Sequence, residues 1–235
     1  MICLIDNFMK TLCLYIAIIT TLLHASIHAE AFDIEITDVP IMTQERYDLM
    51  KDYAKKHYKL PHANLISPKI IVIHYTAIAT LGQSLEAFKT TKIAPFRDKL
   101  ISYGLVNVGA HYVVDRKGNI YSLIPTTLMT RHAIGYNYTS ISIENVGLDA
   151  GNLTDKQIRA NAKLVNMLLF KHPSINYLIG HHEYMNQTLP HYIYYKAEIP
   201  EYSPTIKIDP GFDFMRRLRF HLKRDYNIEF DMSNT

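Results

Sequence analysis

The sequence predicts an α/β protein, a single domain in which a central mixed β-sheet is flanked by α-helices. Short apolar runs rich in β-branched residues alternate along the chain with segments of helical periodicity. Ile70 to Ile73, four such residues in a row, are typical of a strand that is buried on both faces. Thr154 and Gln157 form the capping-box pattern that opens the clearest helix. With 235 residues and 48% apolar content, the chain is long enough to bury a core.

The remaining elements follow from the same local patterns. The helix after Thr154 carries an apolar stripe until His172 and Pro173 stop it. A Lys-Gly-Asn turn between two β-rich runs predicts a hairpin. In chain order we predict a leading strand or loop, a helix near 45–56, a strand at 69–75, a helix at 84–92, hairpin strands at 111–115 and 120–124, a strand at 140–146, a helix at 154–172, a strand at 177–179 and a helix at 212–226.

The first residues predict export. A basic residue precedes an apolar run, residues 11–23, that has the length of a signal-peptide core, and Ala29-Glu30-Ala31 offers a cleavage site. We therefore expect residues 1–31 to be a signal peptide, and the mature protein to lie in the periplasm or cell envelope or to be secreted, with no stable membrane span. An uncleaved anchor helix is the alternative, but the run is short for a bilayer span. A start at Met9 instead of Met1 would give a signal peptide of more usual form.

We divide the rest of the chain into an N-terminal extension packed on the domain (residues 32–68), the domain itself (69–226) and a C-terminal tail (227–235). Both cysteines, Cys3 and Cys13, fall within the signal peptide, so the exported protein would contain neither a disulfide nor a thiolate ligand. Any metal site must then use histidine and carboxylate. The net charge of +3 is mild and no concentrated basic stripe occurs, so nucleic acid is not an expected partner.

Three places in the chain offer a possible metal ligand, each at the end of an apolar run or beside turn residues. His74 ends the first buried strand, and His181 and His182 follow residues 177–179. Asp209 stands directly before Pro-Gly. The chemistry of the residues alone does not choose between His181 and His182. Two imidazoles and one carboxylate leave the fourth position of a tetrahedral zinc ion open, which is the arrangement of catalytic rather than structural zinc sites.

Two further charged residues suit catalysis beside such an ion. Lys207 lies two residues before Asp209, so in an extended segment both side chains point to the same face. Glu144 lies on an apolar strand, where a carboxylate needs a cation or a metal-bound water as its partner. Glu144 would act as general base, and Lys207 would stabilise the developing oxyanion. If the two residues only formed a salt bridge with each other, the protein would be a binder rather than an enzyme.

Seven short motifs carry a family resemblance and extend from about Lys69 to Lys223. They are IVIHYTA around His74, AHYVVDRKGNIYSLIP from Ala110, RHAIG at His132, SISIENVG around Glu144, LTDKQ at the helix start, IGHHE at His181 and KIDPGFDF from Lys207. In this order they resemble the type-2 N-acetylmuramoyl-L-alanine amidases. This zinc family includes the AmpD and AmiD enzymes and is related to phage amidases and peptidoglycan recognition proteins.

The resemblance implies an amidase-2 fold, like that of the peptidoglycan recognition proteins, and a site. One zinc ion per chain would be held by His74, His181 and Asp209, with Glu144 and Lys207 as catalytic residues. The substrate would be peptidoglycan or a muropeptide. The bond cleaved would join the lactyl group of (anhydro-)N-acetylmuramic acid to L-alanine of the stem peptide, in cell-wall turnover or recycling.

The resemblance also implies two substrate contacts. His132 matches a histidine that lines the substrate cleft, and Asn145 would contact the stem peptide.

A non-catalytic peptidoglycan-binding recognition protein remains the main alternative function, and a zinc hydrolase acting on another acylated peptide is a weaker one. His111 is expected to be structural and His191 exposed. The tyrosine-rich segment 184–206 suits a platform for sugar rings and plain packing equally well.

Overall fold

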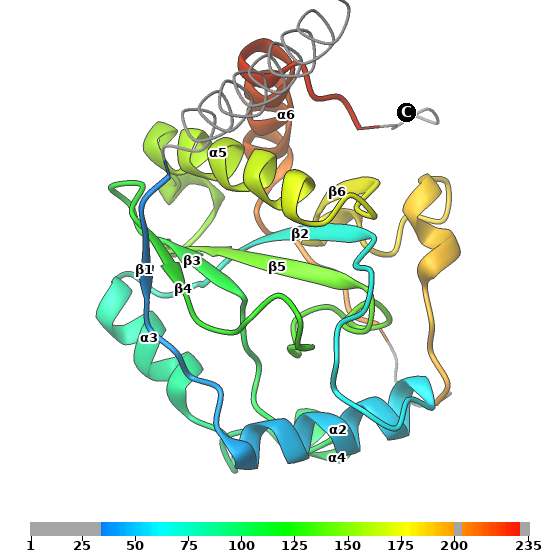
Figure 1. Ribbon diagram of the computed structural model, residues 1–235. Helices are drawn as coiled ribbons and strands as arrows, with labels where there is room; N and C mark the ends of the chain where they lie inside the picture. Colours follow the sequence, from blue (N-terminus) through cyan, green and yellow to red (C-terminus); the bar gives the residue numbers. More distant parts are fainter. Residues whose placement is uncertain (1–33, 200–203, 231–235) are drawn as a thin grey trace, which may run out of the picture. The chain divides into compact units, whose positions relative to one another are not determined.

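The structure, a computed structural model, describes residues 34–199 and 204–230 (Figure 1). The chain divides into two units, Met1–Glu35 and Ile36–Thr235, and the fold given below is that of the second unit. The predicted signal peptide, Cys3 and Cys13 lie outside the described residues. Within the described residues, no helix is both long enough and apolar enough to cross a membrane.

The centre of the fold is one mixed sheet of six strands in the order β1-β4-β3-β5-β2-β6. Only the pair β3 and β4 is antiparallel, which confirms the predicted hairpin, and the other neighbours are parallel. The predicted fold class is therefore confirmed. The strands are β1 (Ile36–Asp38), β2 (Ile70–Tyr75), β3 (Tyr112–Val114), β4 (Ile120–Ser122), β5 (Ser140–Asn145) and β6 (Tyr177–Gly180).

Helices cover both sides of the sheet. In Figure 1, α5 and α6 lie on one side, and α2 and α4 lie on the other. The helices are α2 (Gln44–Tyr58), α3 (Leu81–Lys89), α4 (Asp98–Tyr103), α5 (Asp155–Lys171) and α6 (Phe212–Tyr226), with 3-10 turns η1 (Ala150–Asn152), η2 (His181–Glu183) and η3 (Pro190–Tyr194). The short helix α4 was not predicted, because six residues are too few to show an apolar period. Helix α3 begins before its predicted start because the side chain of Thr80 caps it.

The capping box of α5 connects this helix to the sheet. Thr154 caps the helix as predicted, and Oε1 of Gln157 accepts a hydrogen bond from the backbone N–H of Thr154 at 2.9 Å. Gln157 is fully buried, and its Nε2 also donates to the carbonyls of Val114 and Val146, at 3.2 and 2.9 Å. These carbonyls lie at the ends of β3 and β5. The N-terminus of α5 is therefore fixed against the sheet edge that carries the candidate site.

Residues before the first central strand also belong to the second unit. Strand β1 extends the sheet by pairing with β4, and α2 lies on the same side of the sheet as α4 (Figure 1). Arg46 of α2 is buried, and its guanidinium donates to the carbonyls of Phe88 and Thr90 at 2.5 and 2.7 Å. Part of the segment that we described as an N-terminal extension thus contributes a strand and a helix to the fold.

His111 is a buried structural residue, in keeping with its prediction. Its Nδ1 accepts from the backbone N–H of Ser142 at 2.9 Å, and its Nε2–H donates to the carbonyl of Leu128 at 2.9 Å. Both ring nitrogens are thus used within the protein. Burial lowers the pKa of His111 to about 4, so the ring is neutral at pH 7.

We predict that acid destabilises the fold partly through His111. Because its pKa is about 4 in the folded chain and about 6.5 when unfolded, the unfolded chain takes up the proton first. The contribution of neutral His111 to the free energy of unfolding is fully present above pH 6.5 and is lost as the pH falls toward 4. Over that range the loss approaches roughly 3 kcal/mol, at about 1.36 kcal/mol per pKa unit. Urea unfolding at pH values from 7.5 to 4.5 measures it.

The matched variant is His111→Asn, whose amide oxygen can still accept from Ser142. It should be less stable than the wild type at pH 7.5, because the bond to Leu128 is lost. Its stability should then decline less steeply with falling pH. If the free energy of unfolding fell equally with pH in both proteins, His111 would not be a source of the acid sensitivity.

Candidate metal centre and active site

The candidate site lies at the carboxyl ends of three neighbouring parallel strands. In the sheet β5 pairs with β2, and β2 pairs with β6. His74 and Glu144 are direct register partners on β2 and β5, and Ile73 pairs with Gly180 on β6. His181 therefore follows its strand at the level of His74. Such an edge of parallel strands is where α/β proteins commonly bind ligands.

His74, His181 and Asp209 form a compact cluster of possible metal ligands. The Nδ1 atoms of the two histidines are 3.1 Å apart, and each is 3.1 Å from Oδ2 of Asp209. Ligand atoms bound to zinc at 2.0–2.1 Å in a tetrahedron are separated by about 3.3 Å. One N–H can point at only one of its two neighbours, so hydrogen bonds alone cannot satisfy this triangle. The donor set and its spacing therefore fit a zinc ion.

The structure distinguishes His181 from His182. The backbone N–H of His182 donates to the carbonyl of Asp209 at 2.9 Å, and its Nδ1 lies 3.2 Å from the same oxygen. His181 faces His74, while His182 holds the backbone of the third ligand. Gly180 makes this turn possible, because a Cβ there would lie 2.6 Å from the His182 ring and 2.9 Å from Met215.

An ion pair anchors the turn η2, which carries His181. Glu183 accepts the backbone N–H of Gly180 at 2.7 Å. The same carboxylate accepts two hydrogen bonds from Arg219 of α6, at 3.0 and 2.7 Å. Arg219 also donates to the carbonyl of Leu178 on β6. Helix α6 therefore holds both the strand and the turn that position the ligand.

Burial sets the protonation of the ligands. It lowers the pKa of His181 to about 4, so this imidazole is neutral at pH 7 and can offer a lone pair. Burial alone would raise the pKa of Asp209, but the imidazoles of His181 and His74 beside it hold this pKa well below its usual range. Neutral imidazole and ionised carboxylate are the forms that bind metal.

Glu144 lies beside the ligands with unused hydrogen-bonding capacity. Burial raises the pKa of its carboxyl group to about 7, although the nearby His74 lowers it. Its Oε2 atom is buried and has no hydrogen-bond partner among the described residues. Glu144 and Lys207 form no ion pair within the described part of the chain, so the salt bridge considered as an alternative is not present there. A carboxyl group with a pKa near neutrality is suited to proton transfer.

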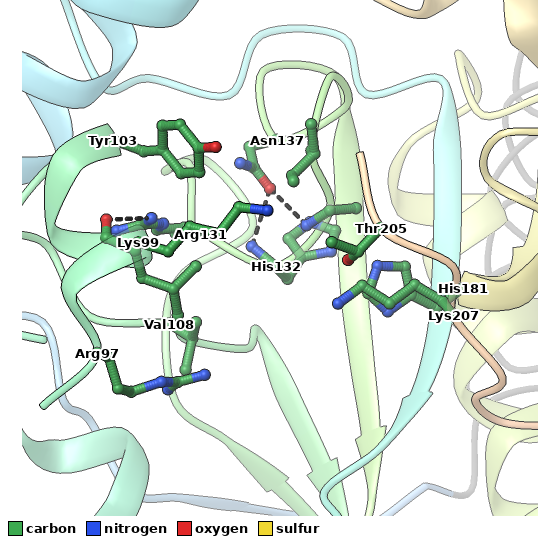
Figure 2. Close-up of a pocket in the computed structure, with 13 residues that line it drawn as sticks. Arg97, Lys99, Tyr103, Val108, Arg131, His132, Asn137, His181, Thr205 and Lys207 are labelled. Atoms are coloured by element: carbon green, nitrogen blue, oxygen red, sulfur yellow. Dashed lines mark hydrogen bonds between the residues drawn. The ribbon is translucent and has the colours of Figure 1, made fainter. Parts of the chain in front are cut away.

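Lys207 lines a pocket of about 180 Å³ next to His181 (Figure 2). Arg97, Lys99 and Arg131 also line it, and none of its lining residues in the described part of the chain is acidic. Arg131 is buried, and its guanidinium donates to three backbone carbonyls, those of Leu100, Gly104 and Val106. The pocket beside the ligands is therefore positively charged.

The two predicted substrate contacts differ in placement. His132 lines the pocket, and its Nδ1 also lies 3.1 Å from Nε2 of His74. Asn145 was predicted to contact the stem peptide, but the structure does not place it at the pocket. It is fully buried and forms hydrogen bonds with the His74 carbonyl and with Asn161 of α5. Successive side chains of β5 point to opposite faces, so Asn145 faces α5 when Glu144 faces the site.

Described tyrosines of segment 184–206 mostly serve packing. Tyr184 is buried, and Tyr194 and Tyr195 pack against the cluster that contains Tyr136. The prediction that His191 is exposed is wrong, because His191 is 1% exposed, within η3. Tyr202 lies outside the described residues. The end of the segment, at Thr205, lines the charged pocket.

Comparison with known proteins identifies the family. The sequence matches the family model Amidase_2, N-acetylmuramoyl-L-alanine amidase, over residues 64–211, which is more than half of the chain. The chain belongs to this family. Both the resemblance and the prediction of an amidase enzyme are thereby confirmed. No curated protein matches the sequence significantly.

Among solved structures, the chain is similar to an N-acetylmuramoyl-L-alanine amidase, to AmpD and to PGRP-SA. The N-acetylmuramoyl-L-alanine amidase LysC from Clostridium intestinale URNW is 18% identical, with a TM-score of 0.47 over 83% of this chain and 99% of its own. A selenomethionine derivative of AmpD is 23% identical, with a TM-score of 0.49 over 81% and 96%. PGRP-SA from Apis mellifera is 21% identical, with a TM-score of 0.42 over 55% and 79%.

We predict that Asp209→Ala removes zinc binding, because the alanine leaves two imidazoles without the anionic ligand. The zinc dissociation constant, measured by competition with a chromophoric chelator, should rise by at least about 100-fold. Asp213→Ala, which removes an exposed carboxylate of α6, is the control and should bind zinc like the wild type. Wild-type affinity in the Asp209 variant would refute the ligand assignment.

Proposed function

We propose that this amidase is zinc-dependent and cleaves the amide between the lactyl group of N-acetylmuramic acid, or its anhydro form, and L-alanine of the stem peptide. It would act outside the cytoplasm, in cell-wall turnover or recycling. The observation that carries the proposal is the triangle of His74, His181 and Asp209 with Glu144 beside it. Export rests on the N-terminal apolar run alone.

The site residues have separate tasks in this reaction. Zinc, when bound, would polarise the amide carbonyl and lower the pKa of a water molecule to about 7. Glu144 accepts the proton of the attacking water at its unpaired Oε2 and returns it to the leaving nitrogen. Lys207, which lines the pocket together with His181, would stabilise the negative charge that develops on the carbonyl oxygen. One such donor is typically worth about 2.7–4 kcal/mol of the barrier.

The main alternative is a protein that binds peptidoglycan without cutting it. A binder needs a groove, but it has no use for a buried carboxylate oxygen without a partner on the strand beside His74 and near Asp209. Keeping such a group in the folded state costs free energy, because it loses hydration without gaining a hydrogen bond. The proton-transfer role of Glu144 therefore favours the enzyme.

The charged pocket supports a peptide substrate with free carboxylates. Arg97 and Lys99 stand at the pocket together with Lys207, and none of the three forms an ion pair within the described residues. Stem peptides carry carboxylate groups. A stem peptide that enters this pocket would place its carboxylates near these cations while its acyl end reaches the ligands.

We predict that Glu144→Gln keeps zinc and substrate binding but loses turnover, because the amide cannot accept the proton. Mass spectrometry of peptidoglycan and of 1,6-anhydro-muropeptides after incubation measures the product. The wild type should release stem peptide with a free L-alanine amine, and the variant should lower the rate by at least about 100-fold. An intact substrate with the zinc-loaded wild type would refute the enzyme, and an active variant would exclude Glu144 as the base.

We predict that reversing the charge of the pocket weakens binding of anionic stems. Arg97→Glu combined with Lys99→Glu should raise KM about tenfold for a muropeptide with free stem carboxylates, which corresponds to about 1.4 kcal/mol. KM for the same muropeptide with amidated carboxylates should change less than about twofold. Lys51→Glu with Lys117→Glu, which alters the same net charge on exposed residues outside the pocket, is the control. Equal effects on both substrates would refute carboxylate recognition.

A further inference from the structure

The ring nitrogen of His74 that faces away from the ligand cluster begins a chain of hydrogen bonds. His74 Nε2 lies 3.1 Å from Nδ1 of His132. His132 Nε2 lies 3.1 Å from Oγ of Ser140, and this hydroxyl lies 2.7 Å from the carbonyl oxygen of Tyr136. The chain thus leads from a candidate ligand through two side chains to the protein backbone.

The chemistry of its last member sets the direction of every bond in this chain. A carbonyl oxygen only accepts, so the Ser140 hydroxyl donates its single hydrogen to Tyr136. The Ser140 oxygen must then accept from the Nε2–H of His132. A neutral imidazole carries one N–H, so Nδ1 of His132 accepts from the Nε2–H of His74. This leaves the Nδ1 lone pair of His74 directed at the ligand cluster.

The frame around His132 is fixed by further bonds. Asn137 is fully buried, and its Oδ1 accepts the backbone N–H groups of His132 and Ala133, at 2.9 and 2.8 Å (Figure 2). Ser140 is also fully buried, at the start of β5. The imidazole of His132 is therefore held from its backbone and from its ring.

We propose that His132 is a positioning residue that holds His74 in the Nε2–H tautomer, with Ser140 and the Tyr136 carbonyl as the anchor. In this role His132 determines that His74 offers Nδ1 to the metal. Metal-binding histidines commonly donate their second N–H to an acceptor that fixes tautomer and orientation, and losing that acceptor typically weakens metal binding by about 10–100-fold. The inference rests on the proposed zinc site and assigns His132 a role different from the expected substrate contact.

The other histidine ligand provides a contrast within the same site. The hydrogen bonds of the His181 side chain within the described residues all involve Nδ1, with His74 and Asp209. His181 is positioned instead through its backbone, by the turn that Glu183 and Arg219 anchor. The two imidazoles are therefore oriented by different means, and within the described residues only His74 has a side-chain partner at its Nε2.

The test compares zinc affinity in three variants of the full chain by competition with a chromophoric chelator. His132→Leu keeps the bulk but removes the acceptor, and it should raise the zinc dissociation constant by about 10–100-fold. His132→Asn places an amide oxygen near the former Nδ1 position and should stay within about threefold of the wild type. The zinc dissociation constant of Ser140→Ala should lie between those of the two His132 variants, because the His132 ring is kept but loses the hydroxyl that orients it.

Nitrogen-15 NMR of the histidine rings gives a second readout that a merely structural role would not change. In the zinc-loaded wild type, His74 should show a protonated Nε2 and a metal-bound Nδ1. In His132→Leu this pattern should be lost or mixed with the other tautomer. The urea midpoint of each metal-free variant shows whether it is folded.

Three outcomes would overturn the proposal. They are a wild-type zinc affinity in folded His132→Leu, an equal loss in the Leu and Asn variants when both are folded, and metal binding through Nε2 of His74. If the wild-type protein itself binds no zinc, the proposed function fails first, so the two failures are distinguishable.

Discussion

The parallel pairing of β2 with both β5 and β6 is the constraint on which the candidate site depends. Parallel neighbours end at the same edge of the sheet, so three segments far apart in sequence present their next residues together. The register places Glu144 beside His74 and brings His181 to the same level. A slip of one residue would turn His74 or Glu144 to the opposite face. Asp209 then needs only to reach this edge from outside the sheet.

The two faces of strand β5 have different roles, because one packs against α5 and the other carries polar residues near the site. Ile141, Ile143 and Asn145 share the parity that faces α5, where Asn145 meets Asn161. The opposite parity consists of three polar residues, Ser140, Ser142 and Glu144, and each serves the histidine-rich side of the sheet. Ser140 contacts His132, Ser142 contacts His111, and Glu144 lies near His74. A buried polar face is stable here because its serines are hydrogen-bonded, while Glu144 keeps one free oxygen.

Local patterns in the sequence were sufficient for the sheet, the hairpin, the long helices and the ligand motifs. They rest on properties that a short segment carries by itself, such as the branched run of β2 and the capping box of α5. The placement of Asn145 was also accessible, because it follows from the alternation of side chains along β5. Chemistry alone did not choose between His181 and His182, since the choice depends on which side chain the Asp209 carbonyl engages.

Features that depend on loops could not be predicted in this way. The contact between His132 and His74 joins residues 58 positions apart, and nothing local to RHAIG indicates it. His191 is buried because η3 folds back onto Tyr136, which a tyrosine-rich sequence does not reveal. Helix α4 is too short to produce a period, although its C-terminal Tyr103 offers a carbonyl to the buried His57 of α2.

The ion pair between Arg219 and Glu183 makes helix α6 part of the structure that positions the candidate site. The match to the amidase family ends at residue 211, just before α6 begins at Phe212. Yet Arg219 of α6 holds the turn that carries His181 and the strand before it. A fragment cut at the end of the family match would contain every candidate ligand and still lack the guanidinium that orients one of them. The working unit therefore extends through the C-terminal helix, beyond the residues that identify the family.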